Sequence, residues 1–315
     1  MAVTRLHAEL ALQVRNNTGE CPVWHAQEQA LYWVDIPEKK LFRYRPDTHG
    51  LHTWDAPQML GCISPSDTPN QWIAGAESGF FQLDTSNEDV LGFTPAGDVD
   101  HAMPGMRFND GRCDRQGRFI AGSMLIDMLA GRNVGRVYQL EWNGQPRQVL
   151  DDLVTPNGTA FSPDGRTLYL TDSHKSVRMS WAFDYDTELG QPFNRRPFMD
   201  MTGFSGRPDG AAMDTDGCYW ICGIDAGLIH RYTPQGVLDM TVSTPVKKPT
   251  MCAFGGADMR TLYVTSTIPA AEGDKRTQDG GLFAIHLPSV QGFPEPQFSR
   301  FPDPLTTTMH TRRQA

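Results

Sequence analysis

Six short apolar runs recur along the chain, starting 40 to 51 residues apart. They are LYWVDI from Leu31, QWIAGA from Gln71, RFIAGS from Arg118, TLYLTDS from Thr167, CYWICGI from Cys218 and TLYVTST from Thr261. Each run is rich in aromatic and β-branched residues and lacks helical periodicity, which predicts a buried β-strand. Most are followed by a more amphipathic run, such as GFFQLD or GLIHRYTP, and turns rich in glycine and proline separate the runs.

A repeating unit of about 45 residues with four short strands is typical of one blade of a β-propeller. Six units therefore predict an all-β protein, a six-bladed β-propeller with four-stranded antiparallel blades. We expect residues 1–305 to form a single propeller domain and the polar residues 306–315 to form a disordered C-terminal tail. A β-sandwich or a two-domain β protein is the alternative, but neither would require the same hairpin six times at similar spacing.

Polar residues stand where the innermost strand of most units is expected to begin. When the units are aligned on the strand before each turn, five of the six equivalent positions carry oxygen: Glu20, Asn109, Asn157, Asp209 and Thr250. The second unit has an apolar residue, near Met59. In a propeller these strand starts converge on the central axis at one face, so we expect Glu20, Asn109, Asn157 and Asp209 to meet there.

A cluster of two carboxylates and two carboxamides in a narrow funnel requires compensation by a cation or a shared proton. All-oxygen donors suit a hard or borderline divalent ion, with water in the remaining positions. The alternative for each single residue is a turn, because Asp or Asn before Gly is a common turn pair. The recurrence of polar residues at the equivalent position of several units favours a functional site over separate turns. Glu20 in TGECPVW favours it too, because no tight turn is needed there.

The bulk properties restrict the partners. The 315 residues carry a formal net charge of -9, with a pI near 5.4, which argues against nucleic acid or an anionic membrane as the main partner. The N-terminus has no apolar signal segment, and no run approaches the roughly 18 apolar residues of a membrane span. We therefore expect a cytoplasmic protein, a monomer or a weak homo-oligomer.

Other chemistry-bearing residues indicate core packing. The six cysteines occur without CxxC pairs, which favours reduced, buried thiols. No GxSxG, P-loop or HExxH motif is present. His174 is interpreted as a solvated loop histidine, although it could reach the mouth of the propeller. The tryptophans expected to pack between blades are Trp24, Trp33, Trp72 and Trp220.

Five ordered motifs resemble the senescence marker protein, gluconolactonase and luciferin-regenerating enzyme family of regucalcin-type sugar lactonases. They are GECPVW, RFNDGRCDRQGRFIAGSM, PNGTAFSPDGRTLYLTDS, RPDGAAMDTDGCYW and KKPTMCAFGGADMRTLYVTS. The resemblance runs from about Thr18 to Leu287, nearly the whole chain. It implies a six-bladed propeller with a divalent ion at its central mouth. Many members hydrolyse sugar lactones, and some are described as calcium-binding regulators.

The resemblance also implies roles for individual residues. Glu20, Asn157 and Asp209 correspond to the metal ligands of the family, and Arg107 and Asn109 correspond to residues that hold the hydroxyls and ring oxygen of the sugar. Asp127 falls where some relatives have an acidic substrate contact; the match is loose, and Met124 is the alternative pocket residue. We expect one divalent ion, with Ca²⁺ favoured over Zn²⁺, Mn²⁺, Fe²⁺ and Mg²⁺.

These residues predict metal-dependent hydrolysis of an aldono-1,4- or aldono-1,5-lactone to the aldonic acid. A metal ion can polarise the carbonyl group and activate water, and Asp209 is the expected acceptor of the water proton. The alternatives are a calcium- or ligand-binding propeller without turnover and an aryl-ester or phosphotriester hydrolase. Arg107 and Asn109 argue against the last, because a hydrophobic organophosphate would leave their polar groups unpaired.

Overall fold

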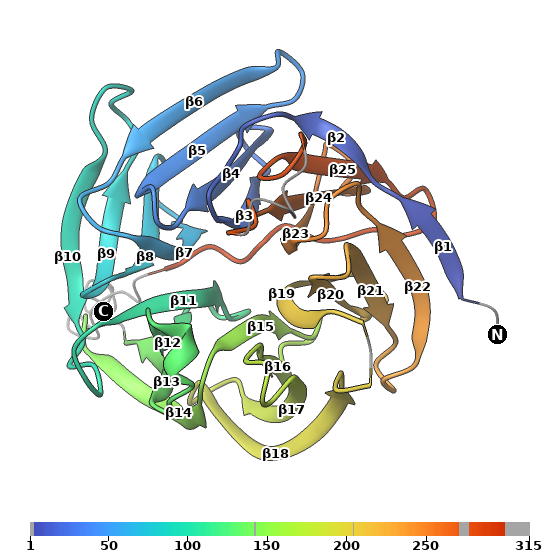
Figure 1. Ribbon diagram of the computed structural model, residues 1–315. Coiled ribbons are helices and arrows are strands. Elements are labelled where there is room, and N and C mark those ends of the chain that lie inside the picture. The colour runs from blue at the N-terminus through green and yellow to red at the C-terminus, as the bar shows by residue number, and fades with distance from the viewer. Residues whose placement is uncertain (1–2, 142, 204, 271–276, 300–315) are drawn as a thin grey trace, which may run out of the picture.

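The computed structural model describes residues 3–141, 143–203, 205–270 and 277–299. In this part of the chain six β-sheets are arranged as a ring around a central axis (Figure 1). The predicted six-bladed propeller is confirmed. The tail expected at residues 306–315 lies outside the described residues.

The strands of the first three blades run outward from the axis in sequence order. Blade 1 contains β3 (Gly19–His25), β4 (Ala30–Asp35), β5 (Lys40–Arg45) and β6 (Gly50–Asp55). Blade 2 contains β7 (Leu60–Pro65), β8 (Gln71–Ala76), β9 (Gly79–Asp84) and β10 (Gly92–Asp98). Blade 3 contains β11 (Met106–Cys113), β12 (Phe119–Leu125), β13 (Gly135–Leu140) and β14 (Pro146–Leu153), with a short 3-10 helix (Met128–Ala130) after β12.

The second half of the chain builds the other three blades. Blade 4 contains β15 (Pro156–Phe161), β16 (Thr167–Asp172), β17 (Met179–Asp186) and β18 (Gln191–Asp200). Blade 5 contains β19 (Arg207–Met213), β20 (Tyr219–Ile224), β21 (Leu228–Tyr232) and β22 (Leu238–Ser243). Blade 6 contains β23 (Pro249–Gly255), β24 (Thr261–Ser266) and β25 (Leu282–His286). Each predicted apolar run lies on the second strand of its blade.

The N-terminal segment closes the ring. β2 (Glu9–Leu12) pairs antiparallel with β25 and becomes the fourth strand of blade 6. β1 (Thr4–His7) pairs parallel with β22 and adds a fifth strand to blade 5. The two ends of the propeller are thus joined by sheet hydrogen bonds, which the repeat pattern did not predict because β1 and β2 are short and half-exposed.

Aromatic side chains fill the spaces between blades. Trp24 of blade 1 stacks on Tyr263 of blade 6 with ring centroids 5.7 Å apart, and Trp72 of blade 2 contacts Tyr32 of blade 1 at 4.3 Å. Trp220 likewise meets Phe254 of blade 6. These three tryptophans pack between blades as predicted, whereas Trp33 stacks on Phe42 within its own blade. All six cysteines are free and buried, as predicted.

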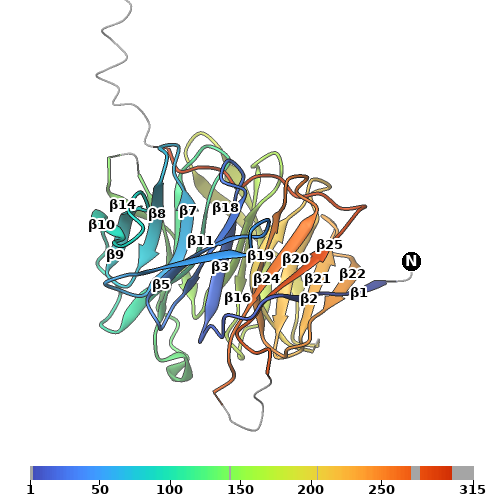
Figure 2. The same ribbon diagram turned by 90° about the horizontal axis from the view of Figure 1, so that it is seen from above.

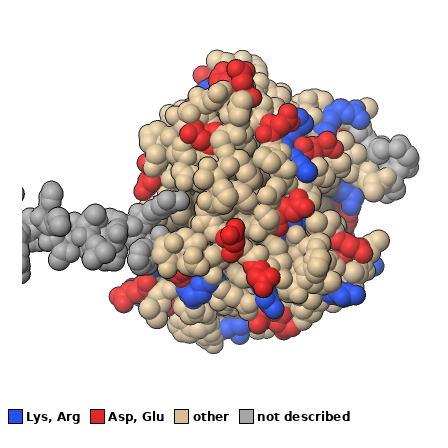
Figure 3. Space-filling model, turned by 90° about the vertical axis from the view of Figure 1, so that its left-hand side faces the viewer, with Lys and Arg blue, Asp and Glu red and all other residues tan. Residues whose placement is uncertain are grey.

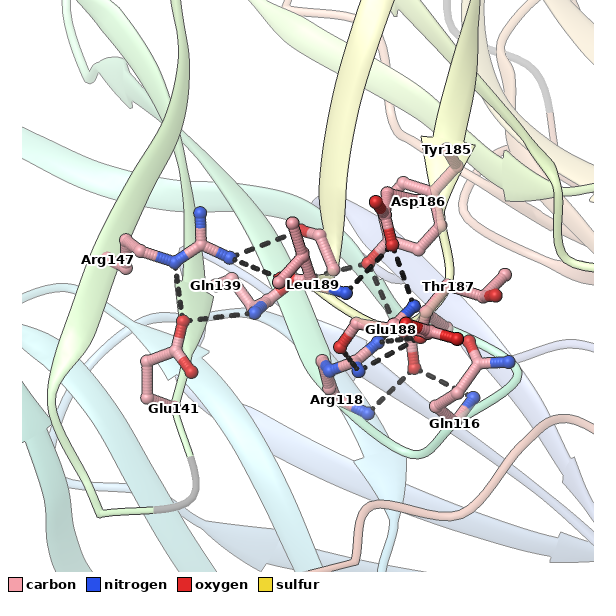
Figure 4. Close-up of polar contacts among 12 residues, drawn as sticks. Gln116, Arg118, Gln139, Glu141, Arg147, Tyr185, Asp186, Thr187, Glu188 and Leu189 are labelled. Carbon is pink, nitrogen blue, oxygen red and sulfur yellow. Dashed lines mark hydrogen bonds and ion pairs between the residues drawn. The ribbon is translucent and has the colours of Figure 1, made fainter.

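A buried carboxylate in a turn connects blade 3 to blade 4, and Figure 4 shows its partners Gln116, Arg118 and Tyr185. Asp114 accepts hydrogen bonds from Gln116 N and Arg118 N, both 2.9 Å, and from Arg118 Nη1 and Tyr185 Oη, both 2.8 Å. Arg118 also donates to the carbonyl oxygens of Thr187 and Glu188 in blade 4. The aligned Asp214 of blade 5 accepts from Cys218 N, Trp220 Nε1 and Arg231 Nε. These aspartates are structural parts of the repeat.

The segment after β25 covers one end of the axis. In Figure 1 it crosses the centre of the ring between β23 and β7. Phe298 pairs with the backbone of blade 2, and Glu295 forms an ion pair with Arg112 of β11 at 2.9 Å. This segment, residues 291–299, is called the strap below. In Figure 2 it lies on the face opposite to the loops that contain residues 126–132 and 268–270.

Charged side chains of both signs are mixed on the surface of the molecule. Figure 3 shows acidic and basic side chains interspersed over the side of the molecule formed by blade 2 and its neighbours. No helix in the described ranges is long and apolar enough to cross a membrane.

Candidate functional site

Every innermost strand has an irregular register close to its first residues. The shifts occur after Glu20 in β3, Leu60 in β7, Phe108 in β11, Asn157 in β15, Pro208 in β19 and Pro249 in β23. A β-bulge leaves ladder positions unpaired and re-aims the side chains next to it. Asn109, Asp209 and Thr250 lie within these interruptions, so their side chains are not committed to sheet packing.

The interrupted strand starts surround a cavity of about 340 Å³ at the axis. Glu20, Arg107, Asn109, Asn157 and Asp209 all line it, although they come from four blades. Thr250, the fifth oxygen-bearing residue of the aligned set, lines it too. A larger hollow of about 720 Å³ adjoins this cavity beside β4 and β5, but it lies off the axis and contains none of the predicted residues.

Blade 2 contributes no polar residue to the cavity, and its backbone explains the exception. A Cβ atom on Gly61 would lie 2.3 Å from the carbonyl oxygen of Phe108. The start of β7 therefore packs directly against the backbone of β11. Met59, the apolar residue of this unit, is partly buried against the core.

Two carboxylates lie close enough in the cavity to affect each other. Burial, followed by the charges of Asp209 and Asp110, raises the pKa of Glu20 well above its usual value. Burial raises the pKa of Asp209 to about 7, with Arg207 acting in the opposite direction. Both shifts show that the protein by itself does not compensate two negative charges here.

The amide of Asn157 joins this pair. Its Nδ2 donates to Oδ1 of Asp209, and its Oδ1 accepts from Gly158 N at 3.2 Å. Gly158 has a φ of 59°, and a Cβ there would lie 2.4 Å from Tyr219 Oη. The Asn-Gly pair is therefore part of an innermost strand, and the turn interpretation does not apply to it.

Arg107 and Asn109 orient each other on β11. Arg107 Nη1 donates to Asn109 Oδ1 at 2.9 Å and to Phe108 O at 2.7 Å. Asn109 Nδ2 donates to Pro156 O of blade 4 at 3.1 Å. Burial lowers the pKa of Arg107 to about 10, while the charges of Glu20 and Asp209 act in the opposite direction. The guanidinium group is thus a cation facing the carboxylates.

Asp127 does not line the cavity. It is exposed, and its Oδ1 accepts a hydrogen bond from Leu129 N at 3.1 Å as the cap of the 3-10 helix. Met124 lines the cavity, as does Met128. His174 is buried, with its Nδ1 bonded to Ser176 Oγ at 2.7 Å, so its interpretation as a solvated histidine is wrong.

Sequence reasoning missed two cations in the cavity wall. Arg207 begins β19, and Lys248 immediately precedes β23. Arg207 Nε and Lys248 Nζ bind the two oxygens of Asp225 at 2.8 and 2.5 Å. Arg207 lies two residues before Asp209 in the RPDG motif. This short spacing from a predicted metal ligand could have indicated that Arg207 also lies at the cavity.

The donors fit a divalent cation. Among the described residues no group of three or more His, Cys, Asp and Glu side chains could hold a metal ion. A cation in this cavity would therefore need amide or water oxygens besides the carboxylates. Glu20, Asp209 and Asn157 form such a set of hard oxygen donors on one cavity, with Asp209 and Asn157 buried and Glu20 half-buried. A cation there would compensate the charges that raise both carboxylate pKa values.

The fold and cavity together define a class: a six-bladed propeller whose axis opens into a pocket of acids, amides and arginine. Residues 18–268 match the region described as SMP-30/Gluconolactonase/LRE-like. The chain belongs to this SMP-30/gluconolactonase/LRE-like family.

Named relatives match along most of their length. The chain is 36% identical to 6-deoxy-6-sulfogluconolactonase of Pseudomonas putida, covering 89% of this chain and 94% of the relative. It is 34% identical to L-arabinolactonase of Azospirillum brasilense, covering 88% and 90%. Luciferin-regenerating enzyme has a similar solved structure, with a TM-score of 0.84, 26% identity, and coverage of 93% of this chain and 99% of that one.

Proposed function

We propose that this protein hydrolyses the lactone of a sugar acid to the open-chain aldonic acid, with one divalent ion bound by Glu20, Asn157 and Asp209. The observation that carries the proposal is the meeting of these three residues with Arg107 and Asn109 in one cavity on the axis. The names of the relatives support the reaction class, because the lactonases among them are named for lactones of sugar acids.

Arg107 and Asn109 are proposed to bind the sugar. Asn109 is fixed by hydrogen bonds at both ends of its amide. Only Nη1 of Arg107 is hydrogen-bonded within the described part of the chain, so Nε and Nη2 remain as donors to hydroxyl or ring oxygens. Met124 and Met128 supply an apolar wall beside them.

Asp209 is proposed to accept the proton of the attacking water. Water adds to the lactone carbonyl carbon and transfers a proton to the Asp209 carboxylate. The ring oxygen then leaves the tetrahedral intermediate and takes the proton back from the Asp209 carboxyl group, which gives the hydroxyl group and regenerates the carboxylate. The Nδ2 donor of Asn157 holds Oδ1 of Asp209 in place, which leaves the other carboxylate oxygen for this transfer.

The divalent ion would supply Lewis-acid polarisation of the carbonyl group and a lower pKa for bound water. The donor set favours an oxygen-binding ion such as Ca²⁺, and Zn²⁺, Mn²⁺, Fe²⁺ and Mg²⁺ are alternatives to be tested. The carboxylates of Glu20 and Asp209 would balance the two positive charges of the ion, and Asn157 would add an uncharged oxygen ligand.

The test is hydrolysis of a lactone panel by metal-stripped protein, followed in a pH-stat with single metals restored and spontaneous opening subtracted. Asp209→Asn should lower kcat about 10²–10⁴-fold because it removes the proton acceptor, and Arg107→Ala should mainly raise KM. Asp55→Asn, at a carboxylate that is 84% exposed in blade 1, is the matched control.

Two results would contradict the proposal. Near-normal turnover by Asp209→Asn would exclude that residue as the base. Metal binding detected by calorimetry, with no acceleration of any lactone, would instead identify a binding propeller without turnover.

A further inference from the structure

Arg207 and Lys248 place two cations around one carboxylate at the rim of the cavity. Their side chains are 28% and 26% exposed, and that of Asp225 is 39% exposed. Arg207 and Lys248 line the cavity, whereas Asp225 does not. Arg207 and Lys248 are therefore the members of this cluster that border the cavity, and Asp225, the most exposed of the three, lies outside the cavity lining.

The hydrogen bonds leave donors available on both cations. Arg207 donates through Nε to Asp225 and through Nη1 to Ser173 O at the long distance of 3.5 Å. Lys248 donates to Asp225 alone within the described residues. A single carboxylate cannot neutralise both side chains, and the other anion that Arg207 influences is Asp209, whose pKa it acts to lower.

This pair lines the same cavity as the groups proposed to act on the carbonyl but is nearer to solvent. Asp209 and Asn157 are buried, with exposures of 7% and 3%, so Arg207 and Lys248 are closer to solvent than the reacting end. Lys248 belongs to blade 6, which is opposite blade 3 and its Arg107 in the ring. A lactone with its carbonyl at the carboxylates could therefore extend its other end toward the rim pair.

We propose that Arg207 and Lys248 form a subsite for an anionic substituent, so that this protein prefers lactones carrying a carboxylate, sulfonate or phosphate group away from the carbonyl. This inference rests on the proposed lactonase function. A guanidinium N–H group and an ammonium group together match the oxygens of such an anion. Asp225 holds the two cations side by side, which reduces the entropy lost when the anion binds.

The alternative interpretation is that this cluster is a structural ion pair that only joins blades 5 and 6. The substitution Asp225→Asn distinguishes a binding subsite from a structural ion pair. Asn tolerates the φ of 77° at this position. Loss of the carboxylate leaves two uncompensated cations, so a binding subsite predicts a higher preference for anionic lactones. A purely structural pair predicts lower stability with no change in preference.

The experiment measures kcat/KM for matched lactones that differ in one anionic group. The 1,5-lactones are glucono-1,5-lactone, its 6-phosphate and its 6-deoxy-6-sulfonate, and the 1,4-lactones are glucono-1,4-lactone and glucaro-1,4-lactone. The readout is the anionic-to-neutral ratio. Arg207→Met combined with Lys248→Met should lower this ratio at least tenfold. Salt should lower the ratio for wild-type protein, because exposed charges are screened. Lys175→Met removes an exposed cation outside the cavity lining and should leave the ratio unchanged.

The outcomes separate this inference from the proposed function. The double substitution could affect anionic and neutral lactones equally, with Asp225→Asn also leaving the ratio unchanged. This result would overturn the proposed subsite and leave the proposed lactone hydrolysis unaffected. Failure of wild-type protein to open any lactone with any metal would overturn both. A preference shared by all three anions would indicate recognition of charge, and a preference for one would identify its chemistry.

Discussion

His230 of blade 5 is a titratable residue outside the cavity lining whose charged form is disfavoured by burial. His230 on β21 is buried, its Nδ1 bonds Thr241 Oγ1 at 3.2 Å, and its Nε2 has no hydrogen-bond partner among the described residues. Burial lowers the pKa of this histidine to about 4. The folded protein therefore favours the neutral ring, whereas the unfolded chain protonates near pH 6.5.

The sign of this shift predicts acid sensitivity. The contribution of His230 to stability is present above about pH 6.5 and is lost as the pH falls toward 4. His230→Gln should therefore flatten the decline in the free energy of unfolding over this range, measured by urea denaturation at several pH values. His286→Gln, at an exposed histidine, is the control. An unchanged pH profile in His230→Gln would contradict the prediction.

At the scale of the element, the interrupted start of each innermost strand is the feature that makes a site. Tyr219 of blade 5 supports the interruption in β15, because its Oη donates to Gly158 O at 2.6 Å and lies 3.1 Å from Thr171 Oγ1. The neighbouring Asn157 therefore depends on a hydroxyl group from the next blade for its position.

Tyr219→Phe should lower the free energy of unfolding by about 1–3 kcal/mol, because it leaves the buried carbonyl oxygen of Gly158 without its donor. It should also weaken metal binding through Asn157, as measured by calorimetry. Tyr232→Phe is a matched control, since Tyr232 is buried and its hydroxyl group has no hydrogen-bond partner among the described residues. Equal effects of the two substitutions on stability would show that the Tyr219 hydroxyl group has no special role.

At the scale of the whole molecule, two chain segments stabilise the ring from outside the six-unit repeat. β1 and β2 join blades 5 and 6, and the strap covers the end of the axis opposite the cavity. Arg112 connects the strap to the interior: its Nη1 binds Glu295, and its Nη2 donates to Ala211 O of blade 5 at 2.8 Å.

Glu295→Ala should destabilise the protein by about 3–5 kcal/mol, because it removes the ion-pair partner of the buried Arg112 guanidinium group and leaves only the charge of Asp110 beside it. Replacing both partners by apolar residues, Arg112→Met with Glu295→Leu, should restore much of this loss. Urea unfolding of the two single variants and the double variant measures the coupling. Additive losses would show that the pair does not hold the strap.

The sequence by itself determined the repeat, the number of blades and four of the polar strand starts that line the cavity. Buried strands must be apolar and their turns need glycine or proline, so these features are written locally in each unit. The shared phase of the units also predicts that Glu20, Asn109, Asn157 and Asp209 meet, since similar units around one axis present equivalent positions to it.

Only the tertiary structure decided the features that depend on contacts between distant segments. The roles of β1 and the strap come from partners far along the chain, at Met240–Ser243 and at Arg112. The position of Arg207 and Lys248 at the cavity depends on their shared partner Asp225. Asp127 stays outside the lining because it caps the 3-10 helix that follows it. A local pattern cannot contain this information for β1, the strap and Lys248, because each is placed by a partner that lies in another blade.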